Sequence, residues 1–347
     1  MALVLLAFTS CSTHNQIEEN PQKIEIEAVK AKELSKKEAP IFRIAMGSCD
    51  HEDASQNFWD IIRVKNPAVW VWLGNIIYAD TRKSKLMEKK YYSLFNDPYY
   101  KIFHSQVRVT GIWGDHDYGE KDVGKNFSIK KKSKELFWNF MQVDRSNSLR
   151  YQEGVYRSEE WNIGARKVKL ILLDTHYNRD PSADGDLLGE AQWKWLESEF
   201  TDSSDYDALL IANARQVLND KNSNNTWATY PKSREHLLKL IEGSPVKIKI
   251  LMSGANKQFG EFSHLSFANG TQVTEVLTCG LTPLEASEDV ENPYRVDNVS
   301  TQNNFAMIDF FNDAKGLAAQ LSLNDIETGN EINQVELKGG SSVSATR

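Results

Sequence analysis

The hydrophobic pattern of the chain starts near residue 41 with a short continuous apolar run, and similar runs recur at intervals. Between several of them lie stretches with helical periodicity, such as residues 57–63 and 190–200. Short apolar strands that alternate with helices indicate buried, largely parallel strands, so the pattern predicts an α/β fold. The runs that we assign to strands occupy residues 42–46, 69–73, 107–113, 168–173, 209–212 and 248–252.

The last third of the chain has a different pattern. Residues 273–278, 305–311 and 317–323 are strand-like and follow one another with turns and little helix. This arrangement predicts a meandering antiparallel edge. The sequence contains no internal repeat and no shift in composition that would divide residues 41–337, so we expect one domain there. Residues 338–347 include a Gly-Gly-Ser-Ser segment and are expected to form a flexible tail.

Composition narrows the classes of function. With 347 residues, 40% of them hydrophobic, the chain is long enough to bury a sizeable core. The net charge of −7 argues against a nucleic-acid partner, which would require clustered positive charge. The one basic run, residues 130–134, precedes several apolar positions. We interpret this run as the solvated face of an amphipathic helix.

The N-terminal segment is typical of a bacterial lipoprotein signal. Residues 3–8 are apolar but too few to span a bilayer, and small residues then precede Cys11. We therefore expect residues 1–11 to be a signal whose processing leaves a lipid anchor on Cys11. Residues 12–40 are polar and are expected to form a tether between the membrane and the folded domain. We expect that domain to be monomeric and to lie in the cell envelope. Since no basic segment precedes the apolar run, an apolar N-terminus without a signal is the alternative.

Polar clusters follow four of the predicted strands. Active sites of α/β sheets gather beyond the carboxyl ends of the strands, so these clusters are expected to converge. They are rich in side chains that bind metals or phosphoryl groups. The clusters read Gly-Ser-Cys-Asp-His at residues 47–51, Gly-Asn-Ile-Ile-Tyr at 74–78, Gly-Asp-His-Asp at 114–117 and Ser-Gly-Ala-Asn-Lys at 253–257.

Three cysteines are too few for a disulfide framework. If Cys11 carries a lipid, Cys49 and Cys279 remain, and each stands at the end of an apolar run. For Cys279 we expect a buried free thiol.

The clusters resemble motifs of the alkaline phosphatase D (PhoD-like) family of metallophosphoesterases. Residues 47–49 match the Gly-Ser-Cys of that family, residues 72–78 resemble its Trp-Leu-Gly-Asp-Asn-Ile-Tyr, and residues 112–119 are similar to its Thr-Trp-Asp-Asp-His-Asp-Tyr-Gly. The resemblance extends over about residues 41–325. It implies a sandwich of two mixed β-sheets flanked by helices. Further similar blocks lie at residues 152–156, 172–175, 188–193 and 293–296.

The resemblance also implies a metal centre of iron and calcium that binds phosphoryl oxygens and activates water for in-line attack. By motif, Cys49 and Tyr78 would be iron ligands, and Asp115 would hold the second metal. His116 would act as phosphate binder or general acid. Position 75 would supply a bridging carboxylate, and positions 255 and 257 would supply a carboxylate and an imidazole.

This sequence departs from that ligand set at several positions. The bridging position is the neutral Asn75, Ala255 offers no ligand, and Lys257 places a cation where an imidazole is implied. Two unit charges about 4 Å apart interact by roughly 4 kcal/mol at an effective dielectric near 20, and a dication doubles that repulsion. Gly114 also replaces a carboxylate. We therefore do not expect a normal metal centre, and a single rewired metal on Cys49, Tyr78 and Asp115 is the alternative.

Two hypotheses of function follow. The resemblance implies a PhoD-like phosphoester hydrolase (a phosphatase or phosphodiesterase) of the cell envelope, acting on a phosphorylated small molecule or an envelope phosphodiester. The alternative is a catalytically silent homologue that binds a phosphorylated ligand, with Lys257 as a point-charge contact to the phosphate. The sequence contains no Gly-x-Ser-x-Gly elbow and no Walker or dinucleotide glycine motif, which argues against the corresponding enzyme classes.

Overall fold

The structure, a computed structural model, describes residues 39–221, 226–254, 260–283, 291–296, 298–313, 316–338 and 341–346. Pro40–Arg347 form one compact unit. The predicted signal, Cys11 and nearly all of the tether lie outside the described residues, as do Ala255 and Lys257. In the described part of the chain, no helix has the length and apolar character required to cross a membrane.

Strands and helices alternate through the first two thirds of the unit, and strands dominate the last third. The elements are β1 (Phe42–Gly47), α2 (Phe58–Val64), β2 (Val69–Leu73), α3 (Ser84–Asn96), α4 (Pro98–Gln106), β3 (Arg108–Ile112), α5 (Asp115–Tyr118), α6 (Lys130–Phe140), β4 (Arg157–Ile163), β5 (Arg166–Leu172), α7 (Glu190–Thr201), β6 (Ala208–Asn213), α8 (Pro231–Gly243), β7 (Ile248–Ser253), β8 (Gly260–Ser266), β9 (Gln272–Thr278), β10 (Asn304–Asp313), β11 (Gly316–Asp325), β12 (Glu331–Lys338) and β13 (Ser341–Thr346).

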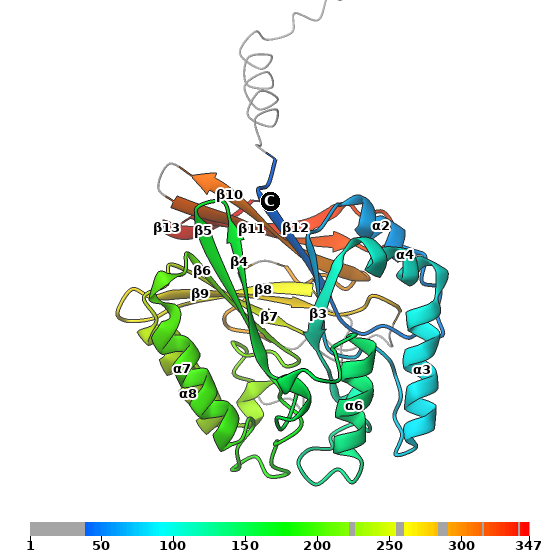
Figure 1. Ribbon diagram of the computed structural model, residues 1–347. Helices are drawn as coiled ribbons and strands as arrows, with labels where there is room; N and C mark the ends of the chain where they lie inside the picture. Colours follow the sequence, from blue (N-terminus) through cyan, green and yellow to red (C-terminus); the bar gives the residue numbers. More distant parts are fainter. Residues whose placement is uncertain are drawn as a thin grey trace, which may run out of the picture. The chain divides into compact units, whose positions relative to one another are not determined.

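The strands form two mixed sheets (Figure 1). One has seven strands in the order β13-β12-β11-β10-β1-β2-β3, and the other has six in the order β4-β5-β6-β7-β9-β8. Strands β1, β2 and β3 are parallel neighbours, as are β5, β6, β7 and β9. The remaining pairs are antiparallel. The predicted α/β sandwich of two mixed sheets is therefore confirmed.

The burial pattern of β2 shows how the layers arise. Side chains on a strand alternate between its two faces. Val69, Val71 and Leu73 pack in the core between the two sheets, whereas Trp70 and Trp72 pack against α2 and α4 on the other face. Because both faces are covered, every residue of β2 is buried, and its sequence is a continuous apolar run. In Figure 1, α7 and α8 cover the six-stranded sheet, and α3, α4 and α6 lie over the other.

The C-terminal segment adds an edge strand to the seven-stranded sheet. Backbone pairing joins β12 and β13 in antiparallel register, from Gln334 opposite Thr346 to Lys338 opposite Ser341. An edge strand presents a row of backbone N–H and C=O groups that a following segment can satisfy. The predicted antiparallel edge thus continues from β10 through β13.

The buried side chain of Lys249 on β7 should make the stability of the protein depend on pH. Lys249 is 5% exposed, and burial lowers its pKa to about 8. Since the unfolded chain binds the proton more tightly, the parent should gain stability as pH rises from about 8 to about 10.5. We expect Lys249→Met to be more stable than the parent by about 1–3 kcal/mol at pH 7, with the difference narrowing over that range. Urea unfolding at several pH values measures it.

The matched control is Lys247→Met, because Lys247 lies two residues earlier on the same segment and is exposed. The control should leave the pH profile of the parent nearly unchanged. A Lys249→Met variant that is less stable than the parent at pH 7 would contradict the prediction.

Candidate functional site

The loops that follow β1, β2 and β3 lie side by side, because these strands are parallel neighbours in one sheet. The loops carry Cys49, Asn75 and Asp115. Their contact is close, since a Cβ atom at Gly114 would lie 2.1 Å from Oδ1 of Asn75. A carboxylate at position 114 would therefore collide with the amide that Asn75 presents. The two departures from the resembled motif are physically linked.

Two strands of the six-stranded sheet also end close to the loop that follows β2. A Cβ atom at Gly254, just after β7, would lie 2.1 Å from the carbonyl oxygen of Leu73. A Cβ atom at Gly74 would lie 3.1 Å from the Cβ of Ala214, just after β6. The carboxyl ends of β6 and β7 thus meet the carboxyl end of β2. Lys257 lies beyond Gly254 and outside the described residues, so its role as a phosphate contact stays a prediction.

Cys49 is joined to Cys279 by a disulfide, with the two Cα atoms 5.4 Å apart. The bond links the loop after β1 to the end of β9 and is buried. Hydrogen bonds support it, since Ser48 Oγ donates to the carbonyl of Thr278 at 2.7 Å and Leu281 N donates to Ser48 O at 3.2 Å. The expected free thiol at Cys279 is therefore corrected. The iron-ligand role implied for Cys49 needs a thiolate, and a disulfide sulfur is not one.

An aromatic stack lies at the solvent side of these loops. Tyr78 lies between two imidazoles, with ring centroids 3.8 Å from His51 and 4.2 Å from His116. Nδ1 of His116 lies 2.7 Å from Oδ1 of Asp80. Burial lowers the pKa of His116, but the hydrogen bond with Asp80 and the charge of Asp115 outweigh it and raise the pKa overall. His116 is thus biased toward its protonated form.

Burial keeps the phenol of Tyr78 in its neutral form. Desolvation, followed by the charges of Asp115 and Asp80, raises the pKa of Tyr78 far above its ordinary value. The phenolate that the resemblance implies for iron binding is therefore disfavoured by the protein around it. The neighbouring His51 is also biased toward its neutral form, since burial lowers its pKa.

Two acids near the loops hold the backbone together. Asp117 accepts hydrogen bonds from the backbone N–H of Gly114 at 2.5 Å and of Ile76 at 3.1 Å, and burial raises its pKa to about 7. Asp174 accepts from the indole of Trp113 at 2.9 Å and from several backbone N–H groups. The oxygens of both carboxylates therefore accept hydrogen bonds that hold these loops in place.

Two buried arginines lie in the loops that follow β5 and β6. Arg215 is 2% exposed, and burial together with the charge of Arg179 lowers its pKa to about 10, while the charge of Asp115 opposes that shift. Burial and the same two arginines lower the pKa of His176 well below its ordinary value. Arg179 is 6% exposed, and its Nε has no acceptor within the described residues. The charge of Arg215 thus acts on Asp115, the residue that the resemblance implies as a ligand of the second metal.

Sequence patterns alone did not single out these arginines. Arg215 follows the end of β6, so the rule that residues beyond strand ends build the site applies to it as well. Its position after β6 is therefore a signal in the sequence, although Ala-Arg-Gln resembles no metal-ligand motif. Arg179 lies in the loop after β5, also beyond the end of a strand.

The residues present do not fit the implied iron and calcium centre. Within the described ranges, no group of three or more His, Cys, Asp or Glu side chains could hold a metal ion. Cys49 lies in a disulfide, and Nδ2 of Asn75 lies 3.9 Å from its sulfur. The charge of Asp115, the implied ligand of the second metal, acts on the guanidinium of Arg215 and raises its pKa. A dication at that ligand would be repelled by the guanidinium.

No protein-family model matches the sequence, and no curated protein matches it either. Solved structures are similar in fold. The structure of PhoD is 15% identical with a TM-score of 0.69, over 88% of this chain and 71% of that chain. A purple acid phosphatase (PPD1) from yellow lupin, Lupinus luteus, is 14% identical with a TM-score of 0.57, over 84% and 53%.

A third structure, described as GAP50, the anchor in the inner membrane complex of Plasmodium, is 12% identical with a TM-score of 0.56 and covers 87% of this chain and 90% of that chain. At these identities the similarity shows the fold alone. The chain has a metallophosphoesterase-like fold.

Proposed function

We propose that this protein is a catalytically silent metallophosphoesterase homologue that binds a phosphorylated ligand with protein cations instead of metal ions. The observation that carries the proposal is the buried pair Arg179 and Arg215, whose charges act on each other and, for Arg215, on Asp115. Holding two like charges out of water costs free energy, and an anion between them lowers that cost.

The chemistry of the pair suits a phosphoryl group. Guanidinium groups stay charged and bind phosphate oxygens through two parallel hydrogen bonds. His116 has a raised pKa and a side chain that is 14% exposed, so it can add a charged donor at the solvent side. Asp80 occupies its Nδ1, which leaves Nε2 for a ligand.

The competing hypothesis is hydrolysis by a metal centre, which the resemblance to PhoD implies. It requires the thiolate of Cys49 and a carboxylate at position 75, and this chain has a disulfide and an amide there. One of the structures similar in fold is described as an anchor in a membrane complex. We therefore favour binding over turnover.

Calorimetry of the metal-free full chain with phenyl phosphate tests the proposal. The parent should bind it without added metal. Arg179→Gln should weaken binding at least tenfold, because a charge-assisted contact is lost. Arg215→Lys keeps the positive charge but cannot form two parallel hydrogen bonds to phosphate, so we expect a smaller loss of affinity than in Arg179→Gln.

The control is Arg63→Gln, which removes the same charge from the half-exposed side of α2. This variant should bind phenyl phosphate like the parent. Near-ultraviolet circular dichroism confirms that each variant is folded. Binding that requires iron or calcium, brisk hydrolysis by the parent, or equal affinity in Arg179→Gln and the parent would each refute the proposal.

A further inference from the structure

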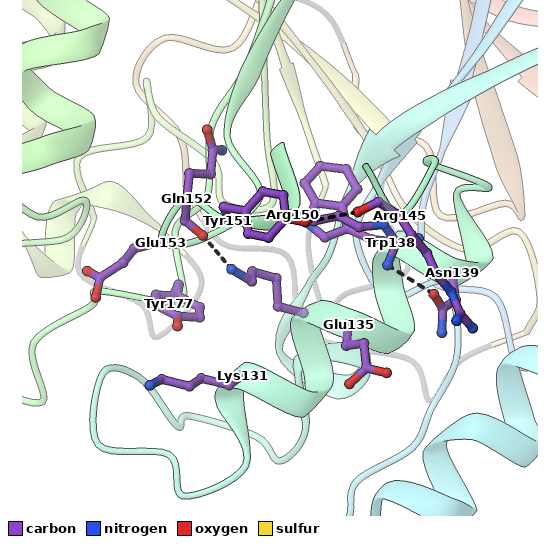
Figure 2. A pocket seen from close by; sticks show the side chains of 11 residues that line it. Lys131, Glu135, Trp138, Asn139, Arg145, Arg150, Tyr151, Gln152, Glu153 and Tyr177 are labelled. Atoms are coloured by element: carbon purple, nitrogen blue, oxygen red, sulfur yellow. Dashed lines mark hydrogen bonds between the residues drawn. The ribbon is translucent and has the colours of Figure 1, made fainter. Parts of the chain in front are cut away.

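A polar cavity of about 630 Å³ lies between α6, the segment after α6 and Tyr177 (Figure 2). Its volume lies within the range of small-molecule sites in proteins. Two of its lining residues, Lys131 and Lys134, belong to the basic run that we interpreted as a solvated helix face. The arginines of the proposed phosphoryl site do not line it, so it is a separate feature.

The cavity concentrates positive charge on an acidic protein. Four cations line it against two carboxylates, although the whole chain carries a net charge of −7. The cations are Lys131, Lys134, Arg145 and Arg150, and the carboxylates belong to Glu135 and Glu153. An excess of cations in a concave site favours an anionic ligand.

Two of the cations already hold the wall in place. Arg150 donates from Nη1 to Oδ1 of Asn139 at 3.0 Å and from Nε to the carbonyl of Val143 at 3.0 Å. Lys134 donates to the carbonyl of Gln152, and its ammonium lies 5.8 Å from the ring centre of Tyr177. These contacts make the wall a preformed structure.

The other two cations are available to a ligand. Lys131 and Arg145 are exposed, and their side chains make no hydrogen bond or ion pair within the part of the chain that the structure describes. Burial, and to a smaller extent the charge of Lys131, lower the pKa of Lys134. An anion bound between these groups would relieve that repulsion.

Aromatic and hydrogen-bonding groups complete the cavity. Tyr151 is 77% exposed and lines the cavity, so its ring can contact a ligand. Glu135, Glu153 and Asn139 provide oxygens that accept hydrogen bonds. A ligand that satisfies all of these groups carries an anion, several hydroxyl donors and an apolar face.

We propose that this cavity binds an acidic monosaccharide. The carboxylate of a uronic acid would pair with Lys131, the hydroxyl groups would donate to the lining carboxylates, and the C–H face of the ring would pack on Tyr151. A small inorganic anion leaves the hydroxyl acceptors and the aromatic face unused. A flat aromatic acid leaves the two carboxylates without donors.

Titration calorimetry with glucuronate tests the proposal on the full chain. The parent should bind glucuronate at least tenfold more tightly than glucose, which lacks the charge, acetate, which lacks the ring, or benzoate, which lacks the hydroxyls. A tetrasaccharide of glucuronate distinguishes a free sugar from a residue of a polysaccharide, and tighter binding of either form supports the proposal.

Two surface variants locate the site. Tyr151→Ala and Lys131→Gln should each weaken binding of glucuronate at least fivefold, and exposed substitutions of this kind rarely unfold a protein. Lys101→Gln, on the exposed face of α4, is the matched control and should bind like the parent. Equal or tighter binding of benzoate or acetate, no binding of glucuronate, or unchanged affinity in both variants would overturn the proposal.

Discussion

Removing the disulfide should lower the free energy of unfolding by about 3–5 kcal/mol. The bond joins residues that are 230 positions apart, and a cross-link that closes so long a loop strongly reduces the conformational entropy of the unfolded chain. We expect this loss in the double variant Cys49→Ala, Cys279→Ala, which avoids burying new hydroxyl groups. Urea unfolding, with and without a reductant, measures it. The reductant should weaken the parent and leave the double variant unchanged.

The control is Cys11→Ala, which removes the remaining cysteine of the chain and should leave the stability unchanged. Thiol labelling of the unfolded, non-reduced parent should detect neither Cys49 nor Cys279. If both residues are labelled and the double variant is as stable as the parent, the disulfide does not form in the protein.

Restoring the implied ligands should restore metal binding only when the disulfide is opened as well. The parent should hold well under one iron per chain. The triple variant Asn75→Asp, Ala255→Asp, Lys257→His should gain little, because the sulfur of Cys49 remains bonded to Cys279. Adding Cys279→Ala frees a thiolate, and we expect close to one iron per chain. The effects are not additive, since ligands of one centre act together.

Elemental analysis and a phosphodiesterase assay on the parent, the triple variant and the quadruple variant measure these outcomes. A control that adds Cys279→Ala to the parent sequence alone should stay low in iron. Occupancy of the second metal should remain weak even in the quadruple variant, because the positive charge of Arg215 acts on Asp115. Stoichiometric iron and brisk turnover in the parent would show that a rewired centre works.

The strands of the core were predictable because their pattern is local. The alternation within β2 sends valines and a leucine to one face and tryptophans to the other, and a strand covered on both faces has to be apolar throughout. Helices α3 and α4 were not predicted. Their sequence contains Tyr92, Tyr99 and Ile102, which are exposed, and these residues weaken the apolar period that marks a helix.

The sequence by itself determined the α/β class and the loops that carry Cys49, Asn75 and Asp115, because strand periodicity and the residues after each strand are read along the chain. Only the tertiary structure decided which partners those loops meet. Cys49 and Cys279 are 230 residues apart, and the charge of Asp115 acts on Arg215, which follows a strand of the other sheet. Contacts of this kind depend on which strand ends converge, and no local pattern encodes that convergence. The packing of the two sheets therefore determined which chemistry the loops can perform.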